Sequence, residues 1–131
     1  MNSVFTHLHP YTIGVEEEYM ICDPHNGNLI NRANEIINSL SKEYKERFSY
    51  ELILAEIESN TPICKDVSTA VSEISKLRKI LKNIGKQYDF KIGISGTHPT
   101  ALSIDQDFVQ NDSYQWVAKQ LSYYAKRNMT F

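Results

Sequence analysis

The stretch "TIGVEEEYMICDP", residues 12–24, places three consecutive glutamates inside a run that otherwise predicts a β-strand. Asp23-Pro24 and the Asn-Gly pair at residues 26–27 are typical turn signals, so we predict a strand from Tyr11 to Cys22. Adjacent carboxylates repel one another, and a strand with one buried face does not readily accept them. The three glutamates therefore need a physical explanation.

Side chains alternate across a strand, so residues i and i+2 share a face. Glu16 and Glu18 should therefore point the same way, whereas Glu17 falls on the face with the apolar residues Ile13, Val15, Tyr19 and Ile21. We expect Glu17 to meet a basic side chain from elsewhere in the chain. Two carboxylates on one face need solvent or a cation to neutralise them, and their hard oxygens suit Mg²⁺ or Mn²⁺.

A second acidic pair lies in "FSYELILAEIESNTP", residues 48–62, which predicts a second strand. Glu56 and Glu58 share one face of it, so two strands together would bring three or four carboxylates onto one sheet face. The alternative interpretation is a solvated face, because antiparallel sheets often expose one side to water. On the residues alone, both interpretations remain open.

The remaining pattern predicts three helices and a third strand. A short helix is expected from Ala33 to about Leu40, a long one from its cap at Asp66 to Gly85, a strand at Phe90–Ser95, and a last helix at about Ser113–Asn128. The long helix carries an apolar stripe made by Val67, Ala70, Val71, Ile74, Leu77, Leu81 and Ile84. Its lysines are interpreted as a solvated face, namely Lys76, Lys79, Lys82 and Lys86.

Half-polar strands and the Asn-Gly turn favour an α+β fold with a mixed or antiparallel sheet over a parallel one. We expect the two longer helices to cover the apolar face of that sheet. Their predicted contacts there are Ile13, Val15, Ile53 and Ile57.

Composition limits the function classes. The 131 residues amount to one domain or a piece of a larger one, with 41% hydrophobic and 23% charged residues and a net charge of −2. The charge gives no reason to expect binding to nucleic acid or an acidic membrane, and no apolar run approaches the roughly 18 residues of a membrane span. Cys22 and Cys64 lack metal-ligand spacing, which favours reduced thiols in a cytoplasmic protein over a disulfide.

Three motifs together resemble a known family. "TIGVEEEYMICDPHNGNL" (12–29), "ELILAEIESNTPIC" (51–64) and "SGTHP" (95–99) are similar, in order and spacing, to the N-terminal part of the glutamate–cysteine ligase type 2 family of carboxylate–amine ligases. The resemblance implies that residues 1–131 form the N-terminal portion of a glutamine-synthetase-like catalytic domain, with a curved antiparallel sheet and helices on one face. It also implies an ATP- and Mg²⁺- (or Mn²⁺-) dependent reaction related to glutathione biosynthesis. In that reaction a glutamate-type side-chain carboxylate becomes an acyl phosphate, which an amine such as that of cysteine attacks.

The same resemblance assigns candidate site residues. Glu16 and Glu18 match the metal positions on the first strand, and Glu58 matches the acidic position before "NTP", so these three are the candidate metal and catalytic residues. Thr61 and His98 are candidate substrate-binding residues. The alternatives are that Thr61 belongs to a strand-ending turn and that His98 belongs to an ordered turn.

The resemblance ends with the chain, before the His-x-His strand expected in relatives, and no Gly-rich phosphate loop is present in the sequence. We therefore expect the isolated chain to be inactive. Its expected partners are the amino-acid and ATP substrates, with a second copy or a C-terminal remainder completing the fold. The alternatives are a non-catalytic remnant or interaction module of the same fold, and an unrelated metal-dependent phosphohydrolase.

Overall fold

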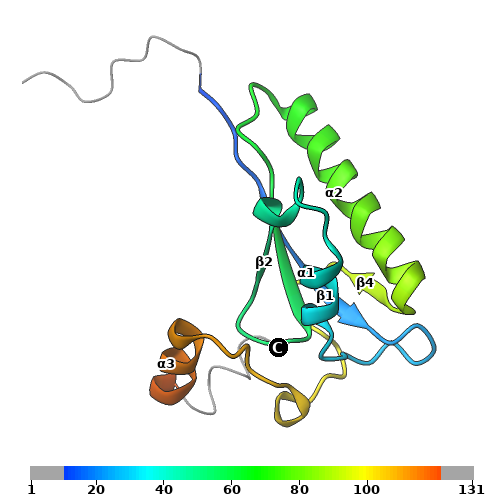
Figure 1. The fold of residues 1–131 in the computed structure, drawn as a ribbon, viewed down its shortest axis with the longest axis vertical. Helices are drawn as coiled ribbons and strands as arrows, with labels where there is room; N and C mark the ends of the chain where they lie inside the picture. Colours follow the sequence, from blue (N-terminus) through cyan, green and yellow to red (C-terminus); the bar gives the residue numbers. More distant parts are fainter. Residues whose placement is uncertain (1–10, 122–131) are drawn as a thin grey trace, which may run out of the picture.

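The structure is a computed structural model and describes residues 11–121. Four strands and three α-helices alternate along this part of the chain, with short 3₁₀ turns at Lys45–Arg47 and Ser103–Asp105 (Figure 1). The elements are β1 (Glu16–Cys22), α1 (Ala33–Ser39), β2 (Phe48–Tyr50), β3 (Glu56–Asn60), α2 (Val67–Tyr88), β4 (Lys91–Gly93) and α3 (Asp112–Leu121).

The strands form one sheet in the order β2-β3-β1-β4, and every neighbouring pair is antiparallel. The predicted α+β fold with an antiparallel sheet is therefore confirmed. β1 lies inside the sheet between β3 and β4, in the register that pairs Glu18 with Glu58 and Tyr19 with Ile57. Because paired residues of an antiparallel ladder point to the same side, this register separates an acidic face from an apolar one.

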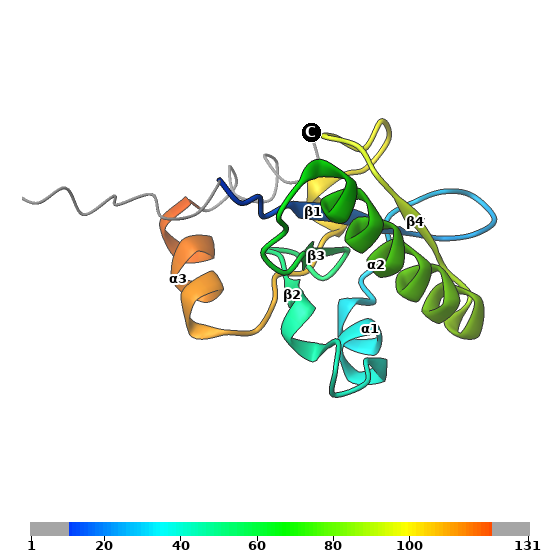
Figure 2. The ribbon, with the colours of Figure 1, turned by 90° about the horizontal axis from the view of Figure 1, so that it is seen from above.

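Helices α1 and α2 cover the apolar face and bury the core against it (Figure 2). The expected stripe of α2 supplies Leu77 and Leu81, which pack with Tyr19, Ile21 and Ile57 of the sheet. Each fully buried side chain of this kind contributes about 1.5–3 kcal/mol through removal of apolar surface from water. Because α1 and α2 both pack on the apolar face, neither helix covers the acidic one.

The two ends of α2 are fixed by different residues. The predicted cap at Asp66 is confirmed, since its side chain accepts a hydrogen bond from the first turn of the helix. The predicted end at Gly85 is wrong, because the helix continues to Tyr88 and ends at Asp89 in the left-handed conformation (φ 54°). Gly85 instead allows a close approach, since a Cβ there would lie 2.6 Å from the carbonyl oxygen of Phe90.

The predicted second strand is two strands. Residues 51–55 interrupt it, and their backbone pairs with residues 107–109 instead: the Leu54 amide donates to the Asp107 carbonyl (2.8 Å) and the Val109 amide donates to the Leu52 carbonyl (3.0 Å). After Glu51 the connection is apolar, and Leu52, Ile53 and Ala55 are buried, so its composition resembles that of a strand. This turn reverses the chain and folds β2 back beside β3.

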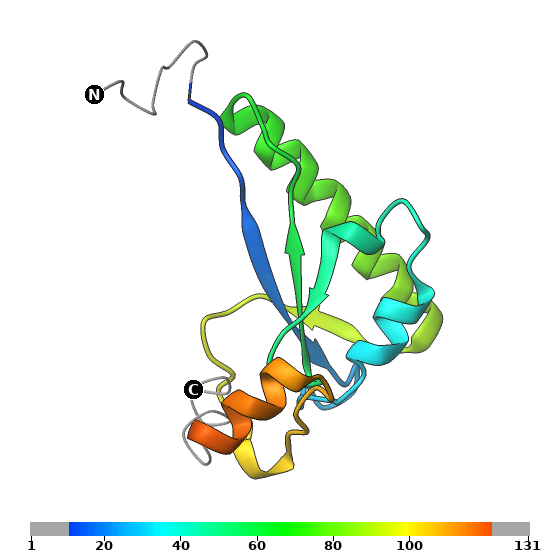
Figure 3. The same ribbon diagram turned by 60° about the vertical axis from the view of Figure 1, so that its left-hand side comes forward.

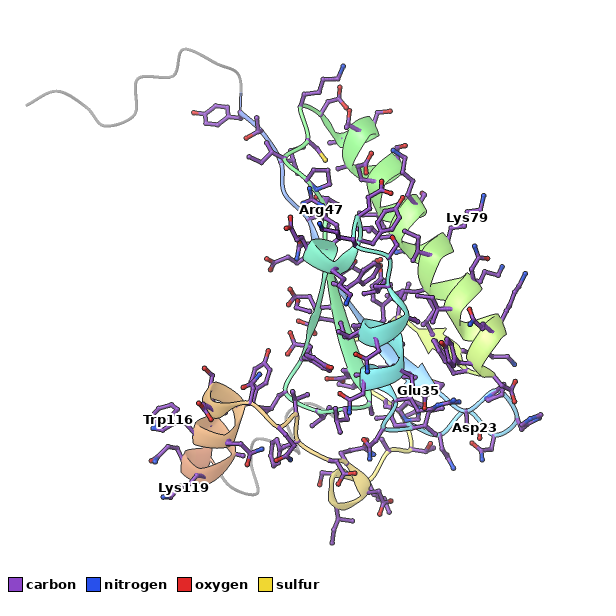
Figure 4. The ribbon with its side chains drawn as sticks, in the orientation of Figure 1. Asp23, Glu35, Arg47, Lys79, Trp116 and Lys119 are labelled. Atoms are coloured by element: carbon purple, nitrogen blue, oxygen red, sulfur yellow. The ribbon has the colours of Figure 1, made fainter. Side chains whose placement is uncertain are left out.

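The expected packing of the last helix on the apolar face is also wrong. α3 lies on the other side of the sheet from α2 (Figures 2 and 3), where the Tyr114 hydroxyl donates to the Tyr50 carbonyl (2.7 Å). Trp116 is 65% exposed and projects away from the sheet (Figure 4). The hydrogen bonds that tie residues 107–109 to 52–54 carry the chain to the β2 edge and so place α3 there. The predicted helical residues 122–128 lie outside the described residues.

Smaller differences concern the strand ends. β1 starts at Glu16 rather than Tyr11, although Ile13 makes an isolated bridge to Cys64, and β4 is shorter than the predicted 90–95 strand. Cys22 and Cys64 are free thiols. Within the described part of the chain, no helix combines the length and apolar character needed to cross a membrane.

Candidate metal centre

The acidic face consists of cross-strand rows of side chains. Glu18 of β1 pairs with Glu58 of β3, which in turn pairs with Ser49 of β2. In the neighbouring row Glu56 pairs with Met20. The register therefore places carboxylates from different strands directly beside one another, an arrangement that is unfavourable without a compensating charge or proton.

Three of these carboxylates converge. Glu18, Glu51 and Glu58 each offer an oxygen, and the three oxygens lie within 4.8 Å of one another. Glu51 joins from the end of β2, and the Ser49 hydroxyl donates to Glu58 (3.2 Å). Divalent cations bind oxygens at about 2.0–2.6 Å, so one ion at the centre of this triangle can contact all three carboxylates.

Burial and neighbouring carboxylates both raise the pKa values of two acids in this region. Burial raises the pKa of Glu51 to about 7, and its hydrogen bond with Glu58 and the charge of Glu18 add to the effect. Burial also raises the pKa of Glu56 to about 8, helped by the charges of Glu51 and Glu18. The side chains that raise these two pKa values are all carboxylates.

Glu56 lies deepest in this group. Its side chain is only 4% exposed, and its Oε2 has no hydrogen-bond partner among the described residues. A buried carboxylate oxygen without a partner is costly, and a bound cation or proton removes that cost. The donor set of hard carboxylate oxygens, partly buried and held on strands, therefore fits a divalent cation such as Mg²⁺ or Mn²⁺.

Glu16 shares the acidic face but not the cluster. It is exposed and pairs with Asn60, one row beyond the Glu18–Glu58 pair. Glu16, Asn60 and Thr61 line a pocket of about 330 Å³ together with Gly14 and Val15. Glu16, Glu18 and Glu58 thus occupy one face, as the alternation predicts, and the last two belong to the three-carboxylate cluster.

Thr61 closes the sheet beside this pocket. Its amide donates to the Val15 carbonyl (2.9 Å), and its hydroxyl oxygen accepts from the Val15 amide (3.0 Å). Thr61 is 9% exposed. These two hydrogen bonds hold the start of β1 and the end of β3 together at the pocket wall. Thr61 therefore ends the strand, and it also lines the pocket beside Glu16.

His98 lies at a different place. It is 8% exposed, and its Nε2 is 2.9 Å from the Gly27 carbonyl in the turn after β1. Its Nδ1 accepts from the Thr100 amide (3.3 Å), which makes Nε2 the protonated nitrogen that donates to Gly27. Both ring nitrogens are therefore occupied in fixing a turn, and the structure does not bring His98 into the carboxylate cluster.

Glu17 points to the opposite face, as predicted, and its basic partner is Arg78 of α2. The Arg78 Nε donates to Glu17 (2.8 Å), and a second guanidinium nitrogen contacts the other carboxylate oxygen. The hydrogen bond from Arg78 is the main cause of the lowered pKa of Glu17, and a bond from the Tyr19 hydroxyl adds to it. This pair ties β1 to α2 directly beneath the acidic face.

Glu51 is the site residue that the sequence interpretation missed. In a single strand from 48 to 62, the odd spacing between Glu51 and Glu58 puts their side chains on opposite faces. The chain reversal at 51–55 removes that constraint and returns Glu51 to the acidic face. The sequence gives no sign of this turn, because its residues are mostly apolar and continue the strand-like pattern on either side.

The fold is thus an antiparallel sheet that carries clustered carboxylates on one face and packs α1 and α2 on the other. Residues 12–131 match the family described as Glutamate-cysteine ligase family 2 (GCS2), and the chain belongs to that family. It is 32% identical over 121 residues to the "Putative glutamate--cysteine ligase 2-1" of Rubrobacter xylanophilus, covering 92% of this chain and 32% of that protein. It is 30% identical over 122 residues to the "Putative glutamate--cysteine ligase 2" of Herpetosiphon aurantiacus, a match that covers 93% of this chain and 32% of that protein. The chain therefore spans about a third of the length of the curated relatives it matches.

Proposed function

We propose that this chain carries the divalent-cation site of an ATP-dependent carboxylate–amine ligase of the glutamate–cysteine ligase type. The observation that carries the proposal is the convergence of oxygens of Glu18, Glu51 and Glu58 within 4.8 Å, with the nearby Glu56 oxygen buried and unpaired among the described residues. Membership of the family supports the reaction class, and the donor set supports Mg²⁺ or Mn²⁺.

The chemistry explains why such a reaction uses an acidic cluster. A carboxylate is a poor acyl donor, and ATP activates it by forming an acyl phosphate, which the amine then attacks with loss of phosphate. Divalent cations supply charge neutralisation for the transferring phosphoryl group. Glu18, Glu51 and Glu58 would hold the cation, and the rigid β1–β3 ladder would fix its position.

Other residues of the acidic face have supporting roles in this proposal. Glu16 and Thr61 line the adjacent pocket of about 330 Å³, and we assign this pocket to the amino-acid substrate. We leave His98 out of the substrate contacts, because Gly27 and Thr100 occupy both of its ring nitrogens. Its role is to hold the turn that follows β1.

The test of the cation site is Mn²⁺ binding, measured by the loss of the free-ion electron paramagnetic resonance signal. We expect Glu51→Gln and Glu58→Gln to weaken binding by about tenfold or more, as loss of groups that hold or orient a metal does. Glu43→Gln, an exposed glutamate outside the cluster, is the matched control and should bind as the unaltered chain does. Equal affinity in all variants would remove the basis of the proposal.

A second candidate is a non-catalytic interaction module of the same fold. The observation that favours it is a set of exposed apolar side chains, Ile63, Val67 and Val71 (82%, 66% and 57% exposed), which a partner surface would cover. A module without catalysis has no need of a cation. An absence of Mn²⁺ binding in the unaltered, folded chain would therefore favour this candidate over the ligase.

A further inference from the structure

A groove of about 960 Å³ lies between α2 and β4, away from the acidic face. Its floor is apolar and includes Leu81, Phe90 and Ile92. Its rim is basic and includes Lys79, Lys82 and Lys86. Pockets of this size accept drug-sized ligands or peptide segments, and we name it the α2–β4 groove.

The basic rim follows from helix geometry. Lys79, Lys82 and Lys86 recur at intervals of three and four residues, so they share one face of α2. No ion pair or hydrogen bond engages their ammonium groups within residues 11–121, whereas Lys76, off this rim, is paired with Glu73. Lys91 adds a fourth positive charge from β4, and its ammonium group donates to the Pro24 carbonyl (2.9 Å). Of the carboxylates in the described chain, only Asp89 lines the groove.

The groove also has free backbone groups at the edge of the sheet. Ile21 of β1 uses its amide toward Ala55 and its carbonyl toward Ile30, so both groups point away from β4. Its partner Ile92 is therefore in a non-hydrogen-bonded pair, and its own amide and carbonyl point outward. Within the described residues, no strand pairs with this outer edge of β4.

We propose that the α2–β4 groove binds an extended acidic segment of another polypeptide, which adds as a strand to the edge of β4. Strand addition uses backbone hydrogen bonds for affinity and side-chain contacts for specificity. The outward amide and carbonyl of Ile92 would supply the backbone hydrogen bonds. The apolar floor and the lysine rim would supply the side-chain contacts. Carboxylates two residues apart on a strand are separated by about 6.8 Å. The axial rise between Lys82 and Lys86 is about 6 Å, so the two spacings match.

Charge selects this occupant over a second copy of the chain. Two β4 edges brought together would place Lys91 and the lysine rim of one copy against those of the other. Like charges across an interface are strongly unfavourable, and a lysine on an edge strand is a common protection against self-pairing. An acidic partner removes that repulsion, and its apolar side chains can contact Ile92, which is only partly buried, whereas Phe90 beneath it is 5% exposed.

The test uses a fluorescein-labelled hexapeptide of alternating valine and glutamate as the probe, with binding measured by fluorescence anisotropy. We expect the chain to bind it, and we expect replacement of the peptide glutamates by glutamine to weaken binding by about tenfold. The double variant Lys82→Glu, Lys86→Glu should show a similar loss. The control variant Lys42→Glu, Lys65→Glu has the same charge change at exposed sites outside the groove and should lose far less.

Two further measurements separate strand addition from simple charge attraction. Hydrogen exchange at the Ile92 amide should slow when the peptide binds, and N-methylation of the central peptide amides should abolish binding. Circular dichroism checks that each variant is folded. An unchanged exchange rate at Ile92, or equal binding of the N-methylated peptide, would overturn the proposal, as would the absence of binding by the folded, unaltered chain.

Discussion

Glu18 of β1 and Glu58 of β3 are direct cross-strand neighbours, although they lie far apart in the sequence. Like charges in this position destabilise a sheet, and Glu51 and Glu56 add two more carboxyl groups nearby. Burial, with the charges of the neighbouring carboxylates, raises the pKa values of Glu51 and Glu56 and so favours their protonated forms. The acidic face is therefore a local source of instability that a bound cation would remove.

The first prediction concerns pH and Glu56. Its pKa is about 8 in the folded chain and near 4.5 in the unfolded one, so between these values the folded state holds a proton that the unfolded state lacks. The free energy of unfolding should therefore fall as pH rises through this window and level off above about pH 8. Glu56→Gln should have little effect near pH 4, below both pKa values, and raise the free energy of unfolding near pH 9 by at least about 2 kcal/mol.

Urea unfolding of metal-free protein at the two pH values provides the measurement. Glu43→Gln, at an exposed position, should change neither value. A stabilisation by Glu56→Gln that is the same at both pH values would contradict the assigned titration.

The second prediction concerns the Glu17–Arg78 pair. Arg78→Ala should lower the free energy of unfolding by about 1 kcal/mol at neutral pH, a modest value because the Arg78 side chain is 48% exposed. The pair lowers the pKa of Glu17, so its contribution exists above the unfolded pKa and is lost as pH falls through the folded pKa. The effect should therefore shrink toward pH 3.

Thermal melting of Arg78→Ala at neutral and acidic pH tests this. Lys79→Ala, next to it on the exposed side of α2 (Figure 4), is the control and should melt close to the unaltered chain. If both substitutions had the same effect at neutral pH, the ion pair would be irrelevant to stability.

The third prediction concerns Gly85. Gly85→Ala should destabilise the fold by about 1–3 kcal/mol, because its Cβ would lie 2.6 Å from the Phe90 carbonyl oxygen and the backbone would have to move. Helix propensity acts in the other direction, favouring alanine over glycine by about 1 kcal/mol. Gln87→Ala, at an exposed position in the same helix, should be nearly neutral in chemical denaturation. A more stable Gly85→Ala variant would mean that the contact with Phe90 relaxes easily.

The fourth prediction is that the isolated chain does not form an amide bond. Acyl phosphate formation needs both substrates held in line and the phosphoryl charge neutralised from several sides, and the described cluster supplies carboxylates only. Phosphate release with ATP, Mg²⁺, glutamate and cysteine should equal that of the Glu16→Gln, Glu18→Gln variant. Release well above that control would show that the chain alone holds a working site.

The parts of the fold that could be predicted from the sequence depend on local periodicity. Alternation along β1 separated Glu16 and Glu18 from Glu17, and the apolar stripe located α2 and its cap at Asp66. The same alternation predicted that Glu17 would meet a basic residue, although it did not identify Arg78 as that residue. Side-chain direction in a strand and contact with a helix face follow from backbone geometry over a few residues, so the sequence alone determined them.

Only the tertiary structure decided which distant side chains meet. The reversal at residues 51–55 is stabilised by pairing with residues 107–109, and without it Glu51 would not reach Glu18 and Glu58. The same pairing carries α3 to the other side of the sheet. These outcomes depend on hydrogen bonds between segments about fifty residues apart, and an apolar run such as Leu52–Ala55 is compatible with a strand or a buried turn until its partner is known.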